Sequence, residues 1–421
     1  MRRLLAHRDA RIYLAGQFLS TLGDSALWLA MGIWVKLLTG SSSAAGLVFF
    51  AFICGTCLGP LTGVITDRVR RRPLLITANL ATGALVCLLL LVGGRSGVWL
   101  VYVVMFGYGV SYSLLSSAQT ALLPALVPAD LLGAANSALQ TVGQGLRIVT
   151  PLLGAGLLAW LGPAPVIVVD AASFAAAAGA VTLLRVREPG RPAAGAPGGA
   201  RWRTELAAGL RHIGSVPSLR RLAIAGIIAA SVFGFFETVE FAVVSDGLHR
   251  SPPFLGVLAM TQGAGGVLAG LLAAPVMARA GARTLITGGL LACAVGCAFE
   301  ASAALALVIP GAALVGGCIV WINIGAITLI QHQTPGHLLG RVDAAVNTVV
   351  TVPQAASIAA GAAALAVAGY RVLLAVMTAV LLAAAAYLAR GPKVRPAPSA
   401  VDTGGNQQSS AGIDTMQPGV R

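Results

Sequence analysis

Charged residues are scarce in this chain of 421 residues. Only 10% of the sequence is Asp, Glu, Lys or Arg, where a soluble domain carries roughly 25%. In contrast, 57% is hydrophobic, and the mean hydropathy is +0.86. So few charges cannot cover a water-facing surface, and we expect most of the surface to face lipid. An all-α membrane protein is the predicted class, because a helix satisfies its backbone polar groups internally.

Cysteine and histidine are also rare, with six and five residues respectively. Cys54 and Cys57 have the spacing of a redox or metal pair, but no histidine or second cysteine pair completes a site. We interpret them as small packing residues of a membrane helix. His332 and His337 flank a predicted loop, where a solvated role is favoured over a metal site. The sequence predicts neither a metal nor a cofactor.

Catalytic motifs are absent as well. The sequence contains no nucleophile elbow and no phosphate-binding loop that ends in Gly-Lys-Ser or Gly-Lys-Thr. We therefore expect no enzyme activity, and the missing phosphate loop argues against an ATP-driven pump. The net charge of +14 suggests nucleic acid as a partner. That partner is excluded because the basic residues occupy short loops and form no stripe among aromatics.

Apolar runs dominate what remains of the sequence. A helix needs about 20 apolar residues to cross a bilayer, and we count twelve such runs. The predicted spans are residues 12–35, 43–66, 73–94, 98–122, 135–160, 164–185, 222–245, 253–277, 283–303, 305–329, 344–368 and 370–389.

The basic residues predict which side of the membrane each loop occupies. Alternate loops hold only Lys36, Arg95, Arg250 and Arg371, and the other loops and both ends hold nearly all the rest. By the positive-inside rule both termini are cytoplasmic, in an inner or plasma membrane. The basic N-terminus lacks a small-residue cleavage site, so we expect its first span to be retained.

The longest predicted cytoplasmic segment divides the chain into two sets of six spans. We expect an N-terminal half at residues 1–186, a linker at 187–220, a C-terminal half at 221–390 and a disordered tail at 391–421. The first part of the linker is rich in Pro, Gly and Ala, and the second part is amphipathic, with Trp202, Leu206 and Leu210 spaced by four residues. This spacing predicts a helix on the inner leaflet.

The two halves are weak repeats of one another. The segment Gly63–Leu75 aligns with Ala274–Ile286, and the segment that begins at Pro128 aligns with the one that begins at Pro335. The two alignments have nearly the same offset, which indicates a duplication. Parallel six-helix halves related by an axis along the membrane normal are a recognised transporter plan.

The segment Gly63–Leu75 resembles the loop signature of the major facilitator superfamily between helices 2 and 3. Arg70 stands where that family prefers glycine. The resemblance extends over nearly the whole chain. It implies the major facilitator fold, with a loop that latches the two halves on the inner side when the cavity opens outward. The residues that match this gating signature are Gly63, Asp67, Arg68, Arg71 and Arg72.

Further stretches resemble one branch of that superfamily. The segments Arg8–Leu27 and Ser116–Gln144 look most like enterobactin-type siderophore exporters and related drug exporters. The segment Gly145–Gly154 resembles the helix-5 signature of drug/proton antiporters, in which Pro151 and Gly154 would bend the helix. Thr150 replaces the expected glycine, and the helix-4 arginine of many proton-coupled exporters is absent.

Ionisable side chains within the spans are candidate functional residues, because each costs about 2.5–3.5 kcal/mol to insert. Asp24 and Arg147 lie at similar depth in the first and fifth spans. We hypothesise that they pair and separate as substrate or a proton binds; the alternative is a static bridge between two helices. Gln140 and Gln144 share a helix side with Arg147 and are predicted to bind a polar substrate.

Three acids in the sixth and seventh spans are further candidates. Glu237 and Glu240 share a helix face because they are three residues apart, and they are predicted to bind a proton. The alternative is that they line the outer vestibule. For Asp170, a place in a cavity wall and a place in a helix interface remain open.

These observations predict a secondary active transporter that exports an amphipathic small molecule, such as a drug, secondary metabolite or siderophore. Proton antiport by alternating access is the predicted mechanism. The alternatives are an uptake or lipid transporter of the same fold, or a non-transporting membrane receptor or scaffold. The expected partners are the substrate, protons and the bilayer, and we expect a monomer.

Overall fold

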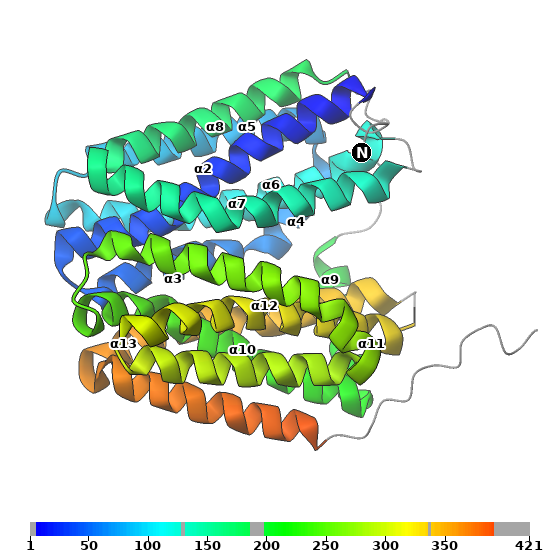
Figure 1. Ribbon diagram of the computed structural model, residues 1–421. Helices are drawn as coiled ribbons and strands as arrows, with labels where there is room; N and C mark the ends of the chain where they lie inside the picture. The colour runs from blue at the N-terminus through cyan, green and yellow to red at the C-terminus, as the bar shows by residue number, and fades with distance from the viewer. Residues whose placement is uncertain (1–5, 128–130, 186–197, 336–337, 391–421) are drawn as a thin grey trace, which may run out of the picture.

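The computed structural model describes residues 6–127, 131–185, 198–335 and 338–390, and their regular structure is entirely helical (Figure 1). The first half of the chain forms one bundle. Its elements are α2 (Arg8–Thr39), α3 (Ser42–Thr56), α4 (Gly59–Arg68), α5 (Arg71–Cys87), η1 (Leu88–Leu91), η2 (Arg95–Gly97), α6 (Val98–Leu126), α7 (Leu132–Leu161) and α8 (Pro163–Leu183).

The second half forms a second bundle, which lies below the first in Figure 1. Its elements are α9 (Gly198–Ser215), α10 (Pro217–Ala242), η4 (Val243–Gly247), η5 (Pro252–Phe254), α11 (Leu255–Ala301), α12 (Leu305–Gln333) and α13 (Leu339–Ala389).

The described elements make twelve crossings, as the apolar runs predict. Eight helical segments are individually long and apolar enough to span a membrane. Two of them, α11 and α13, each cross twice, because Gly281 and Gly369 interrupt them with φ of 80° and 69°. Glycine adopts this left-handed conformation at no steric cost. Together α3 and α4 form one further crossing, and α7 forms another. The prediction of an all-α, twelve-helix membrane protein is confirmed.

The outside of the bundle is apolar. Trp160, Val367, Leu91 and Leu271 are 89%, 90%, 73% and 72% exposed. A water-soluble protein buries side chains of this kind, whereas a membrane protein presents them to lipid.

The repeat that the sequence predicts has a structural counterpart. Leu132 and Leu339 occupy equivalent positions in the second aligned pair of segments, and they are the first residues of α7 and α13. In the first aligned pair Arg70 corresponds to Gly281. Arg70 has extended backbone between α4 and α5, and Gly281 separates the two crossings of α11. The chain therefore turns at the same aligned positions in both halves.

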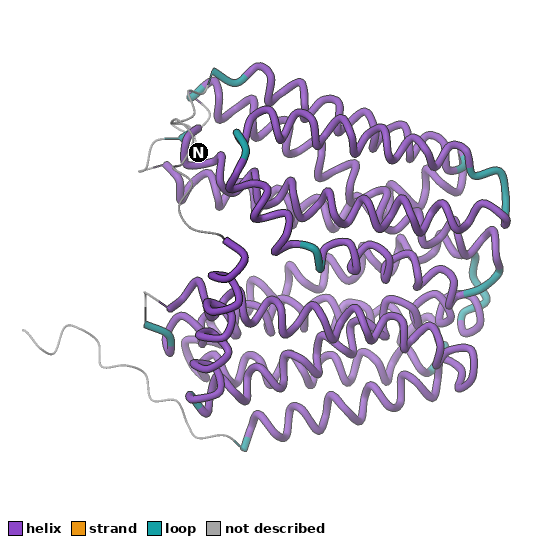
Figure 2. Tube along the Cα trace, turned by 180° about the vertical axis from the view of Figure 1, so that it is seen from behind, coloured by secondary structure: helices purple, strands orange, loops and turns teal. Residues whose placement is uncertain are grey.

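The two bundles touch chiefly at one end. There the Ser43 hydroxyl donates a 2.6 Å hydrogen bond to the Ala362 carbonyl oxygen, and Gly46 of α3 lies against Thr238 of α10. Both ends of the described chain lie at the other end of the bundle, where the bundles diverge (Figures 1 and 2). We call the first end the closed face and the second the terminal face.

Helix α9 runs across the ends of the second bundle at the terminal face (Figure 2). Gly209 allows this contact, because a Cβ there would lie 2.8 Å from the carbonyl carbon of Arg341. Ile213 is buried and Leu210 is 41% exposed. Part of the apolar face of α9 thus packs on protein. Its position on the inner leaflet stays a prediction, and the side chain of Trp202 lies outside the described residues.

Candidate transport cavity

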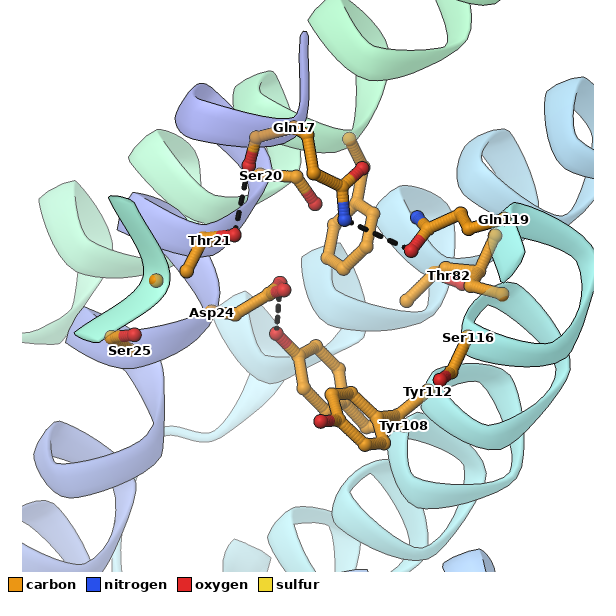
Figure 3. Close-up of a pocket in the computed structure, with 13 residues that line it drawn as sticks. Gln17, Ser20, Thr21, Asp24, Ser25, Thr82, Tyr108, Tyr112, Ser116 and Gln119 are labelled. Carbon is orange, nitrogen blue, oxygen red and sulfur yellow. Dashed lines mark hydrogen bonds between the residues drawn. The ribbon is translucent and has the colours of Figure 1, made fainter. Parts of the chain in front are cut away.

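A cavity of about 260 Å³ opens within the first bundle, among α2, α5, α6, α7 and α8 (Figure 3). Its lining is mostly polar, although it lies between helices that cross the membrane. The lining residues are Gln17, Ser20, Thr21, Asp24, Ser25, Thr82, Tyr108, Tyr112, Leu115, Ser116, Gln119, Gly143 and Phe174.

One tyrosine connects two carboxylates at the base of this cavity. The Tyr108 hydroxyl of α6 donates a 2.8 Å hydrogen bond to Oδ1 of Asp24 in α2, and it lies 3.5 Å from Oδ1 of Asp170 in α8. Asp170 is 0% exposed, and its Oδ2 atom has no hydrogen-bond partner among the described residues. Neither carboxylate forms an ion pair with any side chain that the structure describes.

Gly23 makes the approach of Asp170 to α2 possible. A Cβ at position 23 would lie 2.7 Å from Oδ1 of Asp170 and closer still to the Ser173 hydroxyl. Real side chains do not tolerate such contacts. The two acids are therefore brought together by a close crossing of α2 and α8, which small residues allow in membrane proteins.

Aromatic rings and amides line the cavity beside the acids, and Phe52 packs behind two of the lining tyrosines. The Phe52 ring centroid lies 5.8 Å from that of Tyr108 and 5.6 Å from that of Tyr112. The Phe174 ring meets Tyr108 edge-on at 5.7 Å. On the side toward the chain ends, the Gln17 side-chain amide nitrogen donates a 2.9 Å hydrogen bond to the side-chain oxygen Oε1 of Gln119. The cavity thus offers a carboxylate, hydroxyls, amides and apolar ring faces to a ligand.

The candidate residues of the fifth span, which is α7, are only partly described by the structure. The backbone of α7 borders the cavity at Gly143, and Arg147 occupies the same helix face one turn further on. The side chains of Gln140, Gln144 and Arg147 lie outside the described residues. The predicted pairing of Asp24 with Arg147 therefore stays a prediction.

The predicted bend signature of the fifth span lies in α7, where that helix contacts α2. Pro151 is inside the continuous helix α7. Gly154 packs against α2, and a Cβ there would lie 2.5 Å from the Ala26 carbonyl oxygen. This contact therefore depends on glycine at a close crossing of α7 and α2.

The predicted acids of the seventh span lie on α10 in the second bundle, outside this cavity. Glu237 and Glu240 are both half-buried on α10. The Gln262 amide of α11 donates a 2.8 Å hydrogen bond to Oε1 of Glu240. The sequence did not single out Gln262, because a glutamine within a span has no recognisable partner until the two helices are packed.

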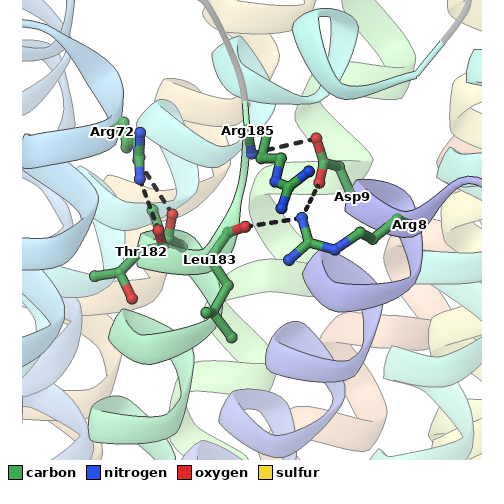
Figure 4. A network of polar contacts seen from close by, with 7 residues as sticks. Arg8, Asp9, Arg72, Thr182, Leu183 and Arg185 are labelled. Atoms are coloured by element: carbon green, nitrogen blue, oxygen red, sulfur yellow. Dashed lines mark hydrogen bonds and ion pairs between the residues drawn. The ribbon is translucent and has the colours of Figure 1, made fainter.

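The start of α5, which belongs to the predicted loop signature between the second and third spans, contacts the end of α8 (Figure 4). The Arg72 guanidinium donates hydrogen bonds of 3.3 and 2.6 Å to the carbonyl oxygens of Val181 and Thr182. These carbonyls lie at the C-terminal end of α8, where a cation is favoured.

Other residues of the gating signature are less closely defined. Gly63 is in α4, and Arg71 begins α5. Asp67 and Arg68 are in the last turn of α4, and their side chains lie outside the described residues. The latch predicted for this loop stays a prediction.

The Tyr108 contacts are what sequence reasoning missed. A tyrosine in a span is common, and nothing in its spacing assigns it to acids that are 84 and 62 positions away. The available signal was the run of polar residues on α6 that includes Tyr108, Tyr112, Ser116 and Gln119, which recur at helical spacing.

Comparison with known proteins decides the family. The profile described as Major Facilitator Superfamily matches residues 13–245, which is more than half of the chain. The chain belongs to the Major Facilitator Superfamily. Members of the superfamily transport solutes across membranes, so the prediction of a non-enzymatic transporter is confirmed.

Two relatives within the superfamily are distant. An uncharacterized transporter of Sinorhizobium fredii is 27% identical over 334 residues, which cover 77% of this chain and 80% of that protein. Macrolide efflux protein A of Streptococcus pyogenes is 26% identical over 179 residues. That match covers 42% of this chain and 44% of the relative, so it spans less than half of each protein.

Solved structures agree on the fold. The crystal structure of a nucleoside transporter has a TM-score of 0.70 at 10% identity and covers 91% of this chain and 98% of that chain. A bacterial homologue of the iron transporter ferroportin has a TM-score of 0.67 at 16% identity, with coverages of 90% and 98%. The two proteins are named for different solutes, and identities of 10% and 16% show a shared architecture alone.

Proposed function

We propose that this member of the superfamily exports an amphipathic small molecule, in exchange for protons and by alternating access. The substrate class comprises drugs, secondary metabolites and siderophores. The observation that carries the proposal is the polar cavity of about 260 Å³ around Asp24 and Tyr108. The partial match to a macrolide efflux protein supports export of an amphipathic small molecule.

The cavity chemistry favours a ligand with one polar, preferably cationic, end and an apolar body. Asp24 supplies a negative group that has no ion-pair partner among the described residues. Phe174, Tyr112 and Leu115 supply apolar surface beside it. Aromatic faces near a carboxylate attract cations, and the apolar body gains free energy from leaving water.

Asp24 and Asp170 together suit an exchange of substrate for a proton. Two carboxylates held by one hydroxyl cannot both remain charged and unpaired in a water-poor site without a large cost in free energy. Binding of either a proton or a cationic substrate removes that cost, so the site needs only one of them at a time. Asp24 and Asp170 are thus suited to bind one or the other. Arg147 and the pair Glu237 and Glu240 are further coupling candidates.

The side to which the terminal face belongs decides which compartment the cavity faces in this state. The positive-inside rule supports a cytoplasmic position for both termini. The closed face then lies outside, and the cavity is in the state that accepts cargo from the cytoplasm. The loop Gly63–Leu75 would close the cytoplasmic side in the opposite state. We propose that the transporter works in the cell membrane as a monomer.

Accumulation of a panel of cationic dyes, macrolides and siderophores in cells with and without the gene tests this proposal. Cells with the gene are expected to retain less of at least one compound, and a protonophore is expected to abolish the difference. Asp24→Asn is expected to abolish it too, whereas Asp9→Asn, outside the cavity and paired with Arg8, is a matched control.

The outcomes distinguish the alternatives. Higher retention in cells with the gene would indicate uptake, and altered phospholipid distribution between leaflets without any change in the panel would indicate lipid movement. Unchanged retention of every compound and unchanged lipid distribution would favour a receptor or scaffold and would overturn the proposal.

A further inference from the structure

A buried acid outside the cavity has no role in the mechanism so far. Glu300 lies near the end of α11 at the closed face, in the second bundle. It is 0% exposed, and neither of its carboxyl oxygens has a hydrogen-bond partner among the described residues. Such a side chain costs several kcal/mol when ionised and unpaired. It therefore requires a ligand that neutralises it.

The neighbours of Glu300 come from three helical segments. Glu240 of α10 is within electrostatic reach of Glu300, and it is also within reach of Glu237. Cys297 of α11 lies beside Glu300 on its own helix. On α12, Gly311 makes room, because a Cβ there would lie 3.3 Å from the Glu300 Cγ atom.

The remaining titratable groups around the site are thiols. Cys293 lies within electrostatic reach of Glu300 and contacts Cys297 and Cys318. Gln262 holds Glu240 through the 2.8 Å hydrogen bond that its amide donates. No described lysine, arginine or histidine forms an ion pair with either acid.

The chemistry of these groups identifies the ligand. Sodium, magnesium and calcium ions require five or more oxygen ligands in most sites, and the thiols beside Glu300 are soft. No group of three or more His, Cys, Asp or Glu side chains is arranged for a metal in the described part of the chain. A proton needs only one carboxylate oxygen, and two acids in mutual reach titrate as a coupled pair.

We propose that Glu240 and Glu300 form a proton-binding site in the second bundle, separate from the cavity of the first. This inference rests on the proposed proton antiport and names the place where a coupling proton is held. Half-buried Glu240 exchanges the proton with water, and sealed Glu300 shares it. The proton bonds to a carboxylate oxygen on arrival and returns to water on the other side when the bundles rock.

Infrared difference spectroscopy of the full-length protein in liposomes measures this proton without a substrate. A protonated buried carboxyl gives a C=O stretching band that shifts in D2O and disappears when the pH is raised. Glu240→Gln and Glu300→Gln are each expected to remove part of this band. Asp9→Asn, which removes a partly exposed carboxylate paired with Arg8, is expected to leave it unchanged. Size-exclusion profiles of all the variants establish that they are folded.

The results separate this site from the proposed function. An unchanged band in both Gln variants overturns the site, whatever the transport data show. If Glu300→Gln does not fold, half-buried Glu240→Gln decides alone. A band that responds to sodium and not to pH would overturn the proton assignment. A band lost in both variants, with transport that ignores the proton gradient, would retain the site and refute proton antiport.

Discussion

At the scale of single residues, the Tyr108 hydroxyl is the group on which the cavity depends. It is the hydrogen-bond donor that the structure shows between Asp24 and Asp170, and its ring packs between Phe52 and Phe174. The ring positions the hydroxyl, and the hydroxyl positions the acids. Removing the oxygen while keeping the ring therefore isolates the polar contribution.

Tyr108→Phe is expected to keep the fold and to lower transport about tenfold or more, because a hydrogen bond to a charged group contributes about 1.5–3 kcal/mol. Efflux of the identified substrate from proteoliposomes measures the effect. Tyr102→Phe is the matched control on the same helix. Its hydroxyl donates a 3.0 Å hydrogen bond to the Ala44 carbonyl oxygen, outside the cavity. Equal transport losses in the two variants would assign Tyr108 a role in stability alone.

At the scale of elements, glycines determine how closely helices cross. The first membrane crossing of α11 packs very closely on α12. A Cβ on Gly265 would collide with the Ala313 carbonyl, and one on Gly316 would collide with the Gln262 carbonyl. Such crossings in membranes are stabilised by packing and not by the hydrophobic effect, because lipid is as apolar as the side chains. The same crossing fixes Gln262, which holds Glu240.

Gly316→Ala is expected to lower the free energy of unfolding by about 1–3 kcal/mol, as overpacking does in a close-packed interior. Gly270→Ala is the control, because its Cβ would meet only Val320 at 3.8 Å, an ordinary contact. There the greater helix propensity of alanine adds up to about 1 kcal/mol. Thermal unfolding in detergent measures both variants. A Gly316→Ala protein as stable as Gly270→Ala would contradict the tight crossing.

The loop Gly63–Leu75 combines a structural role with a proposed gating role. Arg72 caps the end of α8, so Arg72→Gln is expected to cost about 1–2 kcal/mol of stability through the lost charged hydrogen bonds.

Asp67→Asn is expected to slow turnover and to leave substrate affinity nearly intact. Thermal unfolding and proteoliposome kinetics measure the two effects separately. Weakened affinity with normal turnover in Asp67→Asn would refute the latch.

At the scale of the whole molecule, the two bundles are held together at the closed face. Phe49 of α3 and Phe241 of α10 have ring centroids 6.0 Å apart, and the hydroxyl of Ser43 reaches the backbone of Ala362. Alternating access by rocking requires this face to open, since the bundles have no other route to the opposite state. A link across the closed face should therefore stop the cycle.

Cysteines at Ser43 and Ala362, joined by a short thiol cross-linker that a reductant cleaves, are expected to abolish transport and to recover it on reduction. The single Ser43→Cys variant, treated in the same way, controls for the six native cysteines. Proteoliposome flux before and after reduction is the measurement. Full transport by the cross-linked protein would exclude opening at this face.

The sequence alone predicted the elements and their number. A lipid solvent demands about 20 apolar residues for each crossing, so the spans are visible as uninterrupted runs. The aligned starts of α7 and α13 were visible in the same way, because both copies kept the residues at which the chain turns. The family signature at Gly63–Leu75 identified the superfamily for the same reason: a short charged loop between apolar runs is a local feature.

Only the tertiary structure decided which polar groups meet. Asp24 was a candidate from its depth, but its contact with Tyr108 and its proximity to Asp170 depend on how α2, α6 and α8 pack. Nothing local in the sequence distinguishes Glu300, because it lies at the end of an apolar run, where an acid normally faces water. The packing of α10, α11 and α12 buries it within electrostatic reach of Glu240. Spans follow from local hydrophobicity, whereas sites form between residues distant in sequence, through contacts that no local pattern encodes.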